Sequence, residues 1–138
     1  MSPDHVSSTA HTFTSTSSLS ATNIVFDNGS SSISGVYNVA GQTQLNNTAS
    51  ATFNAAADVL SVGALSIQGL TMTFNSGETI TPTSMFLVSG TVTGSDDFVF
   101  GGGSSLTMNL GTISGGGTTT ISPGATLTLQ STSAKTIG

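Results

Sequence analysis

Gly90-Thr91-Val92-Thr93-Gly94 returns later in the chain in closely similar form, as Gly111-Thr112-Ile113-Ser114-Gly115. The same offset relates the other apolar stretches of this region, namely 98–100 to 119–121 and 106–108 to 127–129. A fixed offset of about 20 residues is typical of repeat proteins, in which each period forms one structural unit. The segment 90–131 therefore contains two copies of one unit.

Each unit holds three short apolar stretches separated by Gly, Ser, Asn and Pro. Within a stretch, apolar and polar residues alternate with a period of two, which is the period of a β-strand and not of a helix. Three strands and three turns in one such unit form one coil of a parallel β-solenoid. We therefore predict an all-β protein that folds as a single parallel β-solenoid with three strands per coil.

Apolar residues continue at the same three positions towards the N-terminus, and they recur at intervals of about 20 residues. The first face is expected to bury Ile24, Phe26, Leu45, Leu65, Ile67, Met85, Leu87, Leu106, Met108, Leu127 and Leu129. The second is expected to bury Phe13, Ile33, Phe53, Met72, Val92 and Ile113, and the third Leu19, Val39, Val59, Ile80, Phe100 and Ile121. About six coils, spaced about 4.8 Å apart, would form a rod roughly 30 Å long.

The repeats run through the whole chain, so the 138 residues are predicted to form one domain. Residues 1–12 are interpreted as a polar leader or a partial first coil, and 130–138 as an incomplete last coil. Neither end has an amphipathic helix to cover the open strand edges, and uncapped solenoids tend to stack on another molecule. This favours a segment of a longer solenoid, or a subunit that assembles end to end with itself.

Charged residues make up only 5% of the chain, and its formal net charge is -5. Lys135 is the only basic side chain apart from the histidines. Binding to nucleic acid or to an anionic membrane surface needs a basic patch, so we expect neither. Ser and Thr together are about a third of the residues, far above ordinary usage. The regular apolar stretches nevertheless argue against disorder.

The chain has no cysteine, which excludes disulfides and thiolate metal sites. Its start lacks the basic and apolar regions of a signal peptide. The longest apolar run, 85–88, is far too short to span a bilayer, so we expect no membrane insertion. An extracellular or cell-surface location would then require another export route, or a longer protein of which this chain is a part.

The repeats in 90–131 resemble those of very large exported bacterial surface proteins, of the adhesin-like and autotransporter-passenger-like kinds. The similarity is good over 85–138 and looser over 1–84. It implies a right-handed β-helix in an exported context. It is a similarity of repeat style, so it assigns no functional residue.

Small hydroxyl residues flank the buried position of the second face in every coil. They predict two columns along the rod, made of Thr12, Thr14, Ser32, Ser34, Thr52, Asn54, Thr71, Thr73, Thr91, Thr93, Thr112 and Ser114. This Thr-x-Thr array resembles the flat face of β-solenoid antifreeze proteins, which implies ice as a ligand. The alternative is that Thr is simply a good outward strand residue that stacks well on itself. Replacement by Ser or Asn in several coils favours that alternative, because the methyl groups are lost there.

Asp58, Glu78 and Asp97 recur at nearly the same interval as the coils and predict an acidic column, with Asp96 beside its last member. Stacked carboxylates repel one another unless a hard cation such as Ca²⁺ bridges them. A calcium site is therefore one interpretation, and solvated turn residues are the other and the preferred one.

A polysaccharide-cleaving enzyme could use the same scaffold. It would need paired carboxylates, or a base with a cationic partner. The chain offers a single lysine near its C-terminal end, so we predict no catalytic residue, no cofactor and no enzymatic activity. A carbohydrate-active enzyme is the weakest of the three functional hypotheses.

The sequence thus favours a structural or adhesive segment of a bacterial cell-surface or extracellular fibre. Its partners would be other copies of itself, stacked end to end, or surface carbohydrate. The main alternative is an ice-binding protein that uses the Thr-x-Thr face.

Overall fold

The computed structural model describes residues 4–138, and the side chains of all of them except 5–9. All regular elements in this part of the chain are strands. Their bounds are β1 (Asp4–Phe13), β2 (Ser18–Ile33), β3 (Val36–Leu45), β4 (Ser50–Phe53), β5 (Asp58–Ser61), β6 (Ala64–Ile67), β7 (Thr71–Phe74), β8 (Thr79–Ile80), β9 (Ser84–Leu87), β10 (Thr91–Gly94), β11 (Asp97–Phe100), β12 (Ser105–Met108), β13 (Thr112–Ile113), β14 (Thr119–Ile121), β15 (Thr126–Leu129) and β16 (Thr136–Ile137).

The strands stack as a parallel β-solenoid of about six coils, which confirms the predicted fold class. The first face contains β15, β12, β9 and β6, followed by parts of β3, β2 and β1. The second face contains the ends of β1 and β2, then β4, β7, β10, β13 and β16. The third face contains the starts of β2 and β3 with β5, and a separate three-stranded sheet of β8, β11 and β14.

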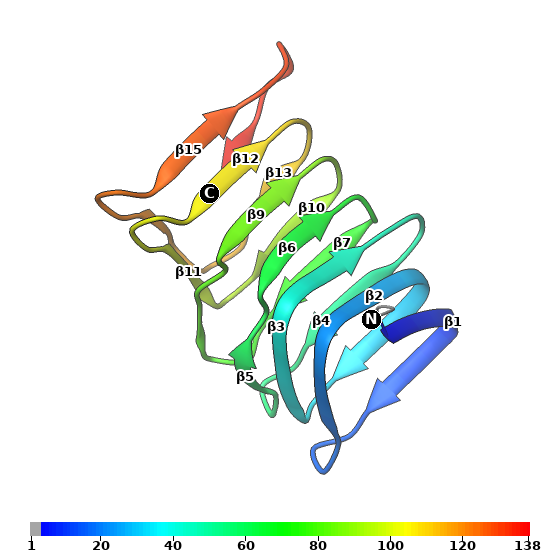
Figure 1. Ribbon diagram of the computed structural model, residues 1–138. Coiled ribbons are helices and arrows are strands. Elements are labelled where there is room, and N and C mark those ends of the chain that lie inside the picture. Colours follow the sequence, from blue (N-terminus) through cyan, green and yellow to red (C-terminus); the bar gives the residue numbers. More distant parts are fainter. Residues whose placement is uncertain (1–3) are drawn as a thin grey trace.

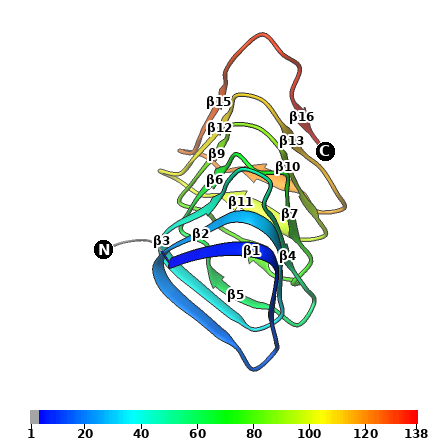
Figure 2. The ribbon, with the colours of Figure 1, turned by 90° about the vertical axis from the view of Figure 1, so that its right-hand side faces the viewer.

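The winding is right-handed. In Figure 1 the front strands β6, β9 and β12 run towards the upper right, and the chain advances from the lower right to the upper left. Figure 2 separates the two long faces: β6, β9, β12 and β15 lie on one side and β7, β10 and β13 on the other. The predicted hand is therefore confirmed.

The core is a narrow column between the three faces. Inward residues alternate with outward ones along the strands, as in β12, where Leu106 and Met108 are buried and Ser105 and Thr107 are half-buried. Each coil leaves one side of its apolar residues uncovered, and the next coil buries that side, so the stack itself provides the stability.

Several predicted partners are displaced by two residues. Phe53 pairs with Phe74 and not with Met72, whose partner is Ala51. On the first face Leu45 pairs with Ile67, and the partner of Leu65 is Thr43.

The third face shows the same displacement, with Leu19 paired to Tyr37 and Phe98 to Ile80. The cause is variable turn length. The turns that lead to the third face at 14–17 and 75–78 have four residues, whereas those at 34–35 and 95–96 have two.

An aromatic column through the core, which was not predicted, follows from this register. The rings of Phe53 and Phe74 are stacked with centroids 4.6 Å apart. Tyr37 meets Phe53 edge-on at 4.9 Å, and Phe98 meets Phe74 edge-on at 5.3 Å. In the next coil Gly94 is the partner of Phe74, at φ 128°, and a Cβ there would collide with the Phe74 carbonyl oxygen. This position of the next coil can therefore be filled only by glycine.

The third face is interrupted in the middle of the rod. β5 pairs with β3, and β8 pairs with β11, but the described strands show no pairing between β5 and β8. Pro82 follows β8 almost at once, and proline has no N–H to donate to a ladder. The two long faces are continuous past this point, so they hold the coils together there.

The two ends of the described chain both contribute strands. β1 pairs with β2 over residues 4–13, so these residues form part of a coil. At the other end, β16 pairs with β13, so residues 136–137 belong to the second face of the last coil.

Candidate functional site: the hydroxyl face and the acidic turns

The outward side of the second face carries columns of small hydroxyl residues, but the columns differ from the predicted ones. One column contains Ser30, Ser50, Thr71, Thr91, Thr112 and Thr136. The next contains Thr12, Ser32, Thr52, Thr73, Thr93 and, one residue beyond the paired part of β13, Ser114.

The predicted columns joined Thr52 to Thr71 and Asn54 to Thr73, which is wrong by two residues. Thr52 pairs with Thr73, and Ser50 with Thr71. Thr14, Ser34 and Asn54 instead follow the strands, at the start of the turn to the third face. The predicted pairing of Thr71 and Thr73 with Thr91 and Thr93 is confirmed, and only the columns on the N-terminal side of β7 change.

The face is uncharged, since none of these outward positions holds an acidic or basic residue. Some hydroxyls on it are already occupied. The Asn54 side chain donates to Ser32 Oγ at 2.8 Å and to Ser34 Oγ at 3.0 Å. These two hydrogen bonds lie on the N-terminal part of the face. Among the described residues, no asparagine side chain donates to a hydroxyl group of β7 or β10.

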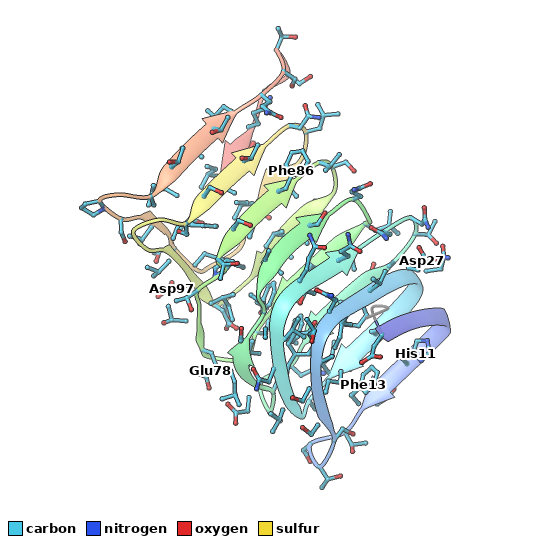
Figure 3. All side chains as sticks on the ribbon, in the orientation of Figure 1. His11, Phe13, Asp27, Glu78, Phe86 and Asp97 are labelled. Carbon is cyan, nitrogen blue, oxygen red and sulfur yellow. The ribbon has the colours of Figure 1, made fainter. Side chains whose placement is uncertain are left out.

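The acidic residues do not form the predicted column. Asp97 pairs with Thr79, so Glu78 lies one position away from the alignment. Figure 3 shows Glu78 and Asp97 pointing outward at separate levels of the rod. Among the described residues, no group of three His, Cys, Asp or Glu side chains is placed to hold a metal ion. The structure therefore does not gather Asp58, Glu78 and Asp97 into the column that the calcium interpretation requires.

Asp96 is buried and binds a turn of the preceding coil. Its Oδ2 accepts hydrogen bonds from the backbone N–H and the hydroxyl of Ser76, at 2.8 and 2.5 Å. Its Oδ1 accepts one from the Gly77 N–H at 2.8 Å. Three donors satisfy the carboxylate, so its role is to fix the 75–78 turn to the next coil.

Asp97 makes the corresponding contact in the opposite direction. Its Oδ1 accepts hydrogen bonds from the Thr118 N–H at 2.7 Å and the Thr118 hydroxyl at 2.9 Å. The backbone bond, and then the hydroxyl bond, lower the pKa of Asp97 because both favour the charged form. Two adjacent carboxylates thus clamp the turns of two different coils. In the sequence, the signal for the Asp96 contact is that Ser76 and Gly77 precede Asp96 by 20 and 19 residues, which is about one coil.

A buried polar pair lies inside the core at the level of β3. The hydroxyls of Tyr37 and Thr43 are 2.8 Å apart, and Thr43 donates to the Val62 carbonyl oxygen at 2.8 Å. Both residues are fully buried, and burial raises the pKa of Tyr37 well above its usual value. The pair has no access to solvent, so it serves the structure. Neither residue was predicted to be in the core.

An open hollow of about 370 Å³ lies near the N-terminal end of the rod. Its lining includes Asp4, Asn23 and Asn38, with Ser20 and Thr22. It contains one carboxylate, whereas glycoside hydrolysis uses two that flank the bond to be broken. The hollow therefore offers polar contacts but not that chemistry.

The chain between residues 4 and 138 contains no helix long and apolar enough to cross a membrane. Comparisons of the chain with protein-family models, with curated proteins and with solved structures found no match.

Proposed function

We propose that the chain is a structural segment of a bacterial cell-surface or extracellular fibre. The observation that carries this proposal is the continuity of the two long faces. Parallel ladders run from β1 to β15 on the first face and from β1 to β16 on the second. At about 4.8 Å per coil, six coils form a stiff rod of roughly 30 Å, which suits a spacer.

The exported, bacterial context comes from the resemblance of the repeats in 90–131 to those of bacterial surface proteins. The hydroxyl-rich outward columns support weak contacts with surface carbohydrate or with neighbouring rods, because they present many donors and acceptors without charge. Side-chain clamps between coils, such as Asp96 with Ser76 and Asp97 with Thr118, support resistance to local unfolding.

Limited proteolysis tests the structural role. The folded rod should resist proteinase K and thermolysin, which cleave exposed flexible chain, and small-angle scattering should give an elongated particle. Leu106→Asp is the matched control, because a charge between coils should abolish folding and resistance together. Rapid digestion of the wild-type chain between coils would contradict the proposal.

Ice binding is the second candidate, and the observed register is the specific observation that favours it. Thr71 and Thr73 lie beside Thr91 and Thr93, and these lie beside Thr112 and Ser114. Neighbours along a strand are about 6.6 Å apart and neighbours across coils about 4.8 Å, which gives a flat, regular lattice of hydroxyl groups.

Thermal hysteresis and ice-crystal shaping test this candidate. If the face binds ice, Thr91→Tyr with Thr112→Tyr should remove the activity, because both residues belong to one column. Ser84→Tyr with Ser105→Tyr is the matched control, since these residues form a similar column on the first face. Absence of hysteresis in the wild-type chain would exclude ice as a ligand.

A further inference from the structure

Asn28 and Gly29 lie at the corner where β2 passes from the first face to the second. Figure 3 shows this corner at Asp27, on the outside of the rod. Asn28 is exposed, and Gly29 has a φ of 74°, in the left-handed region. An asparagine followed by glycine forms a succinimide readily, because glycine has no side chain to obstruct attack by its backbone nitrogen on the amide carbon. Asn28-Gly29 is the only Asn-Gly pair in the chain.

The backbone of Gly29 is not held in a regular β-ladder. Among the described strands, β1 pairs with Asn28 and then with Ser30, and the register shifts between them. On the other side, the pairing with β3 ends at Phe26 and the pairing with β4 begins at Ser30. Gly29 therefore has no aligned partner in these strands, which leaves its nitrogen freer to approach the Asn28 side chain.

Hydrogen bonds hold the Asn28 amide in one orientation. Its Nδ2 donates to Asp27 Oδ2 at 3.2 Å, and its Oδ1 accepts a hydrogen bond from the Thr48 hydroxyl at 3.0 Å. Asp27 is held in turn by Asn47, whose Nδ2 donates to Asp27 Oδ1 at 2.6 Å. Asn28, Asn47 and Thr48 are exposed, so water can reach the amide.

The Thr48 hydroxyl points at the atom on which charge develops during attack on the amide. When a nucleophile adds to the Asn28 Cγ, the negative charge of the tetrahedral intermediate lies on Oδ1. A donor that is already aimed at this oxygen stabilises the intermediate and accelerates the reaction.

We propose that Asn28 is a site of spontaneous deamidation, for which the fold supplies the Thr48 hydroxyl as the oxyanion donor. This modification goes beyond the structural role proposed above and does not rest on it. The Gly29 nitrogen loses its proton to solvent and forms a bond to the Asn28 Cγ, which places a negative charge on Oδ1.

Collapse of this intermediate breaks the bond between Cγ and Nδ2. The nitrogen takes a proton from water and leaves as ammonia, and a succinimide remains between positions 28 and 29. Water then opens the succinimide at either carbonyl group and gives aspartate or isoaspartate. The net reaction consumes one water and releases one ammonia.

The product changes the charge and the contacts of the corner. It adds one negative charge to a chain whose formal net charge is -5. A carboxylate at position 28 cannot donate to Asp27, so a hydrogen bond is replaced by repulsion between like charges. The modified corner should therefore be attached less firmly to the turn over 46–49, between β3 and β4.

Asn75 is a control within the same molecule. Its Oδ1 also accepts a hydrogen bond, from the Ser95 N–H at 3.0 Å. The nitrogen of the following residue, Ser76, is nevertheless engaged, because its N–H donates to Asp96 Oδ2 at 2.8 Å. Asn75 thus has the oxyanion donor without the free nucleophile, and it should react much more slowly than Asn28.

Peptide mapping by mass spectrometry tests the proposal after the folded chain is incubated in mildly alkaline buffer enriched in heavy-oxygen water. We expect aspartate and isoaspartate at position 28, with one oxygen from the solvent, before any change at Asn75. Thr48→Val should slow the reaction of the folded chain by about five- to tenfold, as expected for the loss of one hydrogen bond. Thr48→Ser keeps the hydroxyl and should retain the rate.

Urea-unfolded samples separate the effect of the fold from the reactivity of the Asn-Gly pair. Unfolded wild type and unfolded Thr48→Val should react at equal rates, because the hydrogen bond between the coils is absent from both. Thr107→Val, on an outward position of β12, is the control for the same substitution elsewhere and should leave the rate unchanged. Circular dichroism checks that each variant is folded.

Three results would overturn the proposal: no product at position 28 while the unfolded chain is converted, equal rates for folded wild type and folded Thr48→Val, or conversion of Asn75 as fast as that of Asn28. Asn28→Asp reproduces the aspartate product, and its melting temperature should lie below that of the wild type. An unchanged or higher melting temperature would refute the expected weakening of the corner.

Discussion

Thr43→Val alone is expected to destabilise the fold more than the double variant of Thr43→Val with Tyr37→Phe. The Thr43 hydroxyl lies between the Tyr37 hydroxyl and the Val62 carbonyl oxygen, at 2.8 Å from each. Thr43 and Tyr37 are fully buried, so no water can replace a lost partner. Thr43→Val removes both bonds and leaves the Tyr37 hydroxyl without a partner in the core.

The magnitude follows from the number of groups left unsatisfied. A buried polar group without a partner costs about 1–3 kcal/mol, and a typical net hydrogen bond contributes about 1 kcal/mol. Thr43→Val leaves the Tyr37 hydroxyl and the Val62 carbonyl oxygen without a partner, so it should lower the free energy of unfolding by about 2–4 kcal/mol. Tyr37→Phe alone should cost about 1 kcal/mol, since Thr43 still donates to Val62. The double variant leaves only the Val62 carbonyl oxygen without a partner, so its free energy of unfolding should be about 1–2 kcal/mol higher than that of Thr43→Val.

Urea unfolding followed by far-UV circular dichroism measures these differences, provided that the transition is cooperative. Thr107→Val is the control for the same change at an outward position, and it should alter the free energy of unfolding by less than about 0.5 kcal/mol. A double variant as unstable as the sum of the two single variants would refute the reasoning, because it would mean that Tyr37 and Thr43 do not satisfy each other.

Four further predictions concern the core, the turns and pH. Leu106→Asp should prevent folding, because it buries an unpaired charge between coils, whereas Thr107→Asp, on the outward side, should leave the melting temperature nearly unchanged; similar effects of the two would show that the alternation is misassigned. Gly94→Ala should lower the melting temperature strongly, because its φ is 128° and the new Cβ would collide with the Phe74 carbonyl oxygen, whereas Gly102→Ala, at an exposed position with more room, is the control and should have little effect. EDTA and added Ca²⁺ should not change the melting temperature, because Asp58, Glu78 and Asp97 are not gathered; a rise with Ca²⁺ would contradict this placement. Burial raises the pKa of Tyr37 in the folded state, so the folded chain holds the phenol proton more tightly than the unfolded chain does. The stability that this group contributes should be fully present below about pH 10 and should fall as the pH rises further. Urea titrations at increasing pH measure this loss, and Tyr37→Phe should lack it.

The fold could be predicted from the sequence because the alternation and the constant offset between coils are both local signals. They were clearest where the turns have constant length, between 90 and 131. There the predicted partners are the observed ones, such as Val92 with Ile113 and Leu106 with Leu127. Thr119 stands where the neighbouring coil has Phe98, and the register was still correct.

The register between 45 and 74 could not be predicted from the alternation, for a simple physical reason. A slip of one residue exchanges the inward and outward sides, which the pattern detects. A slip of two residues keeps every side chain on its own side, so Met72 and Phe74 fit equally well beside Phe53. Only the turn length distinguishes them, and the alternation within the strands does not reveal the length of a turn. The aromatic column of Phe53 and Phe74 was missed for the same reason.

The candidate site was predicted in kind but not in arrangement. The hydroxyl residues lie on the outward side of the second face, as expected, yet their columns depend on the register and were therefore displaced. The acidic residues were aligned by spacing alone, which does not fix the direction of a side chain at the start of a strand. Asp96, just before β11, is buried against Ser76, whereas Asp97, the first residue of β11, is exposed beside Thr118.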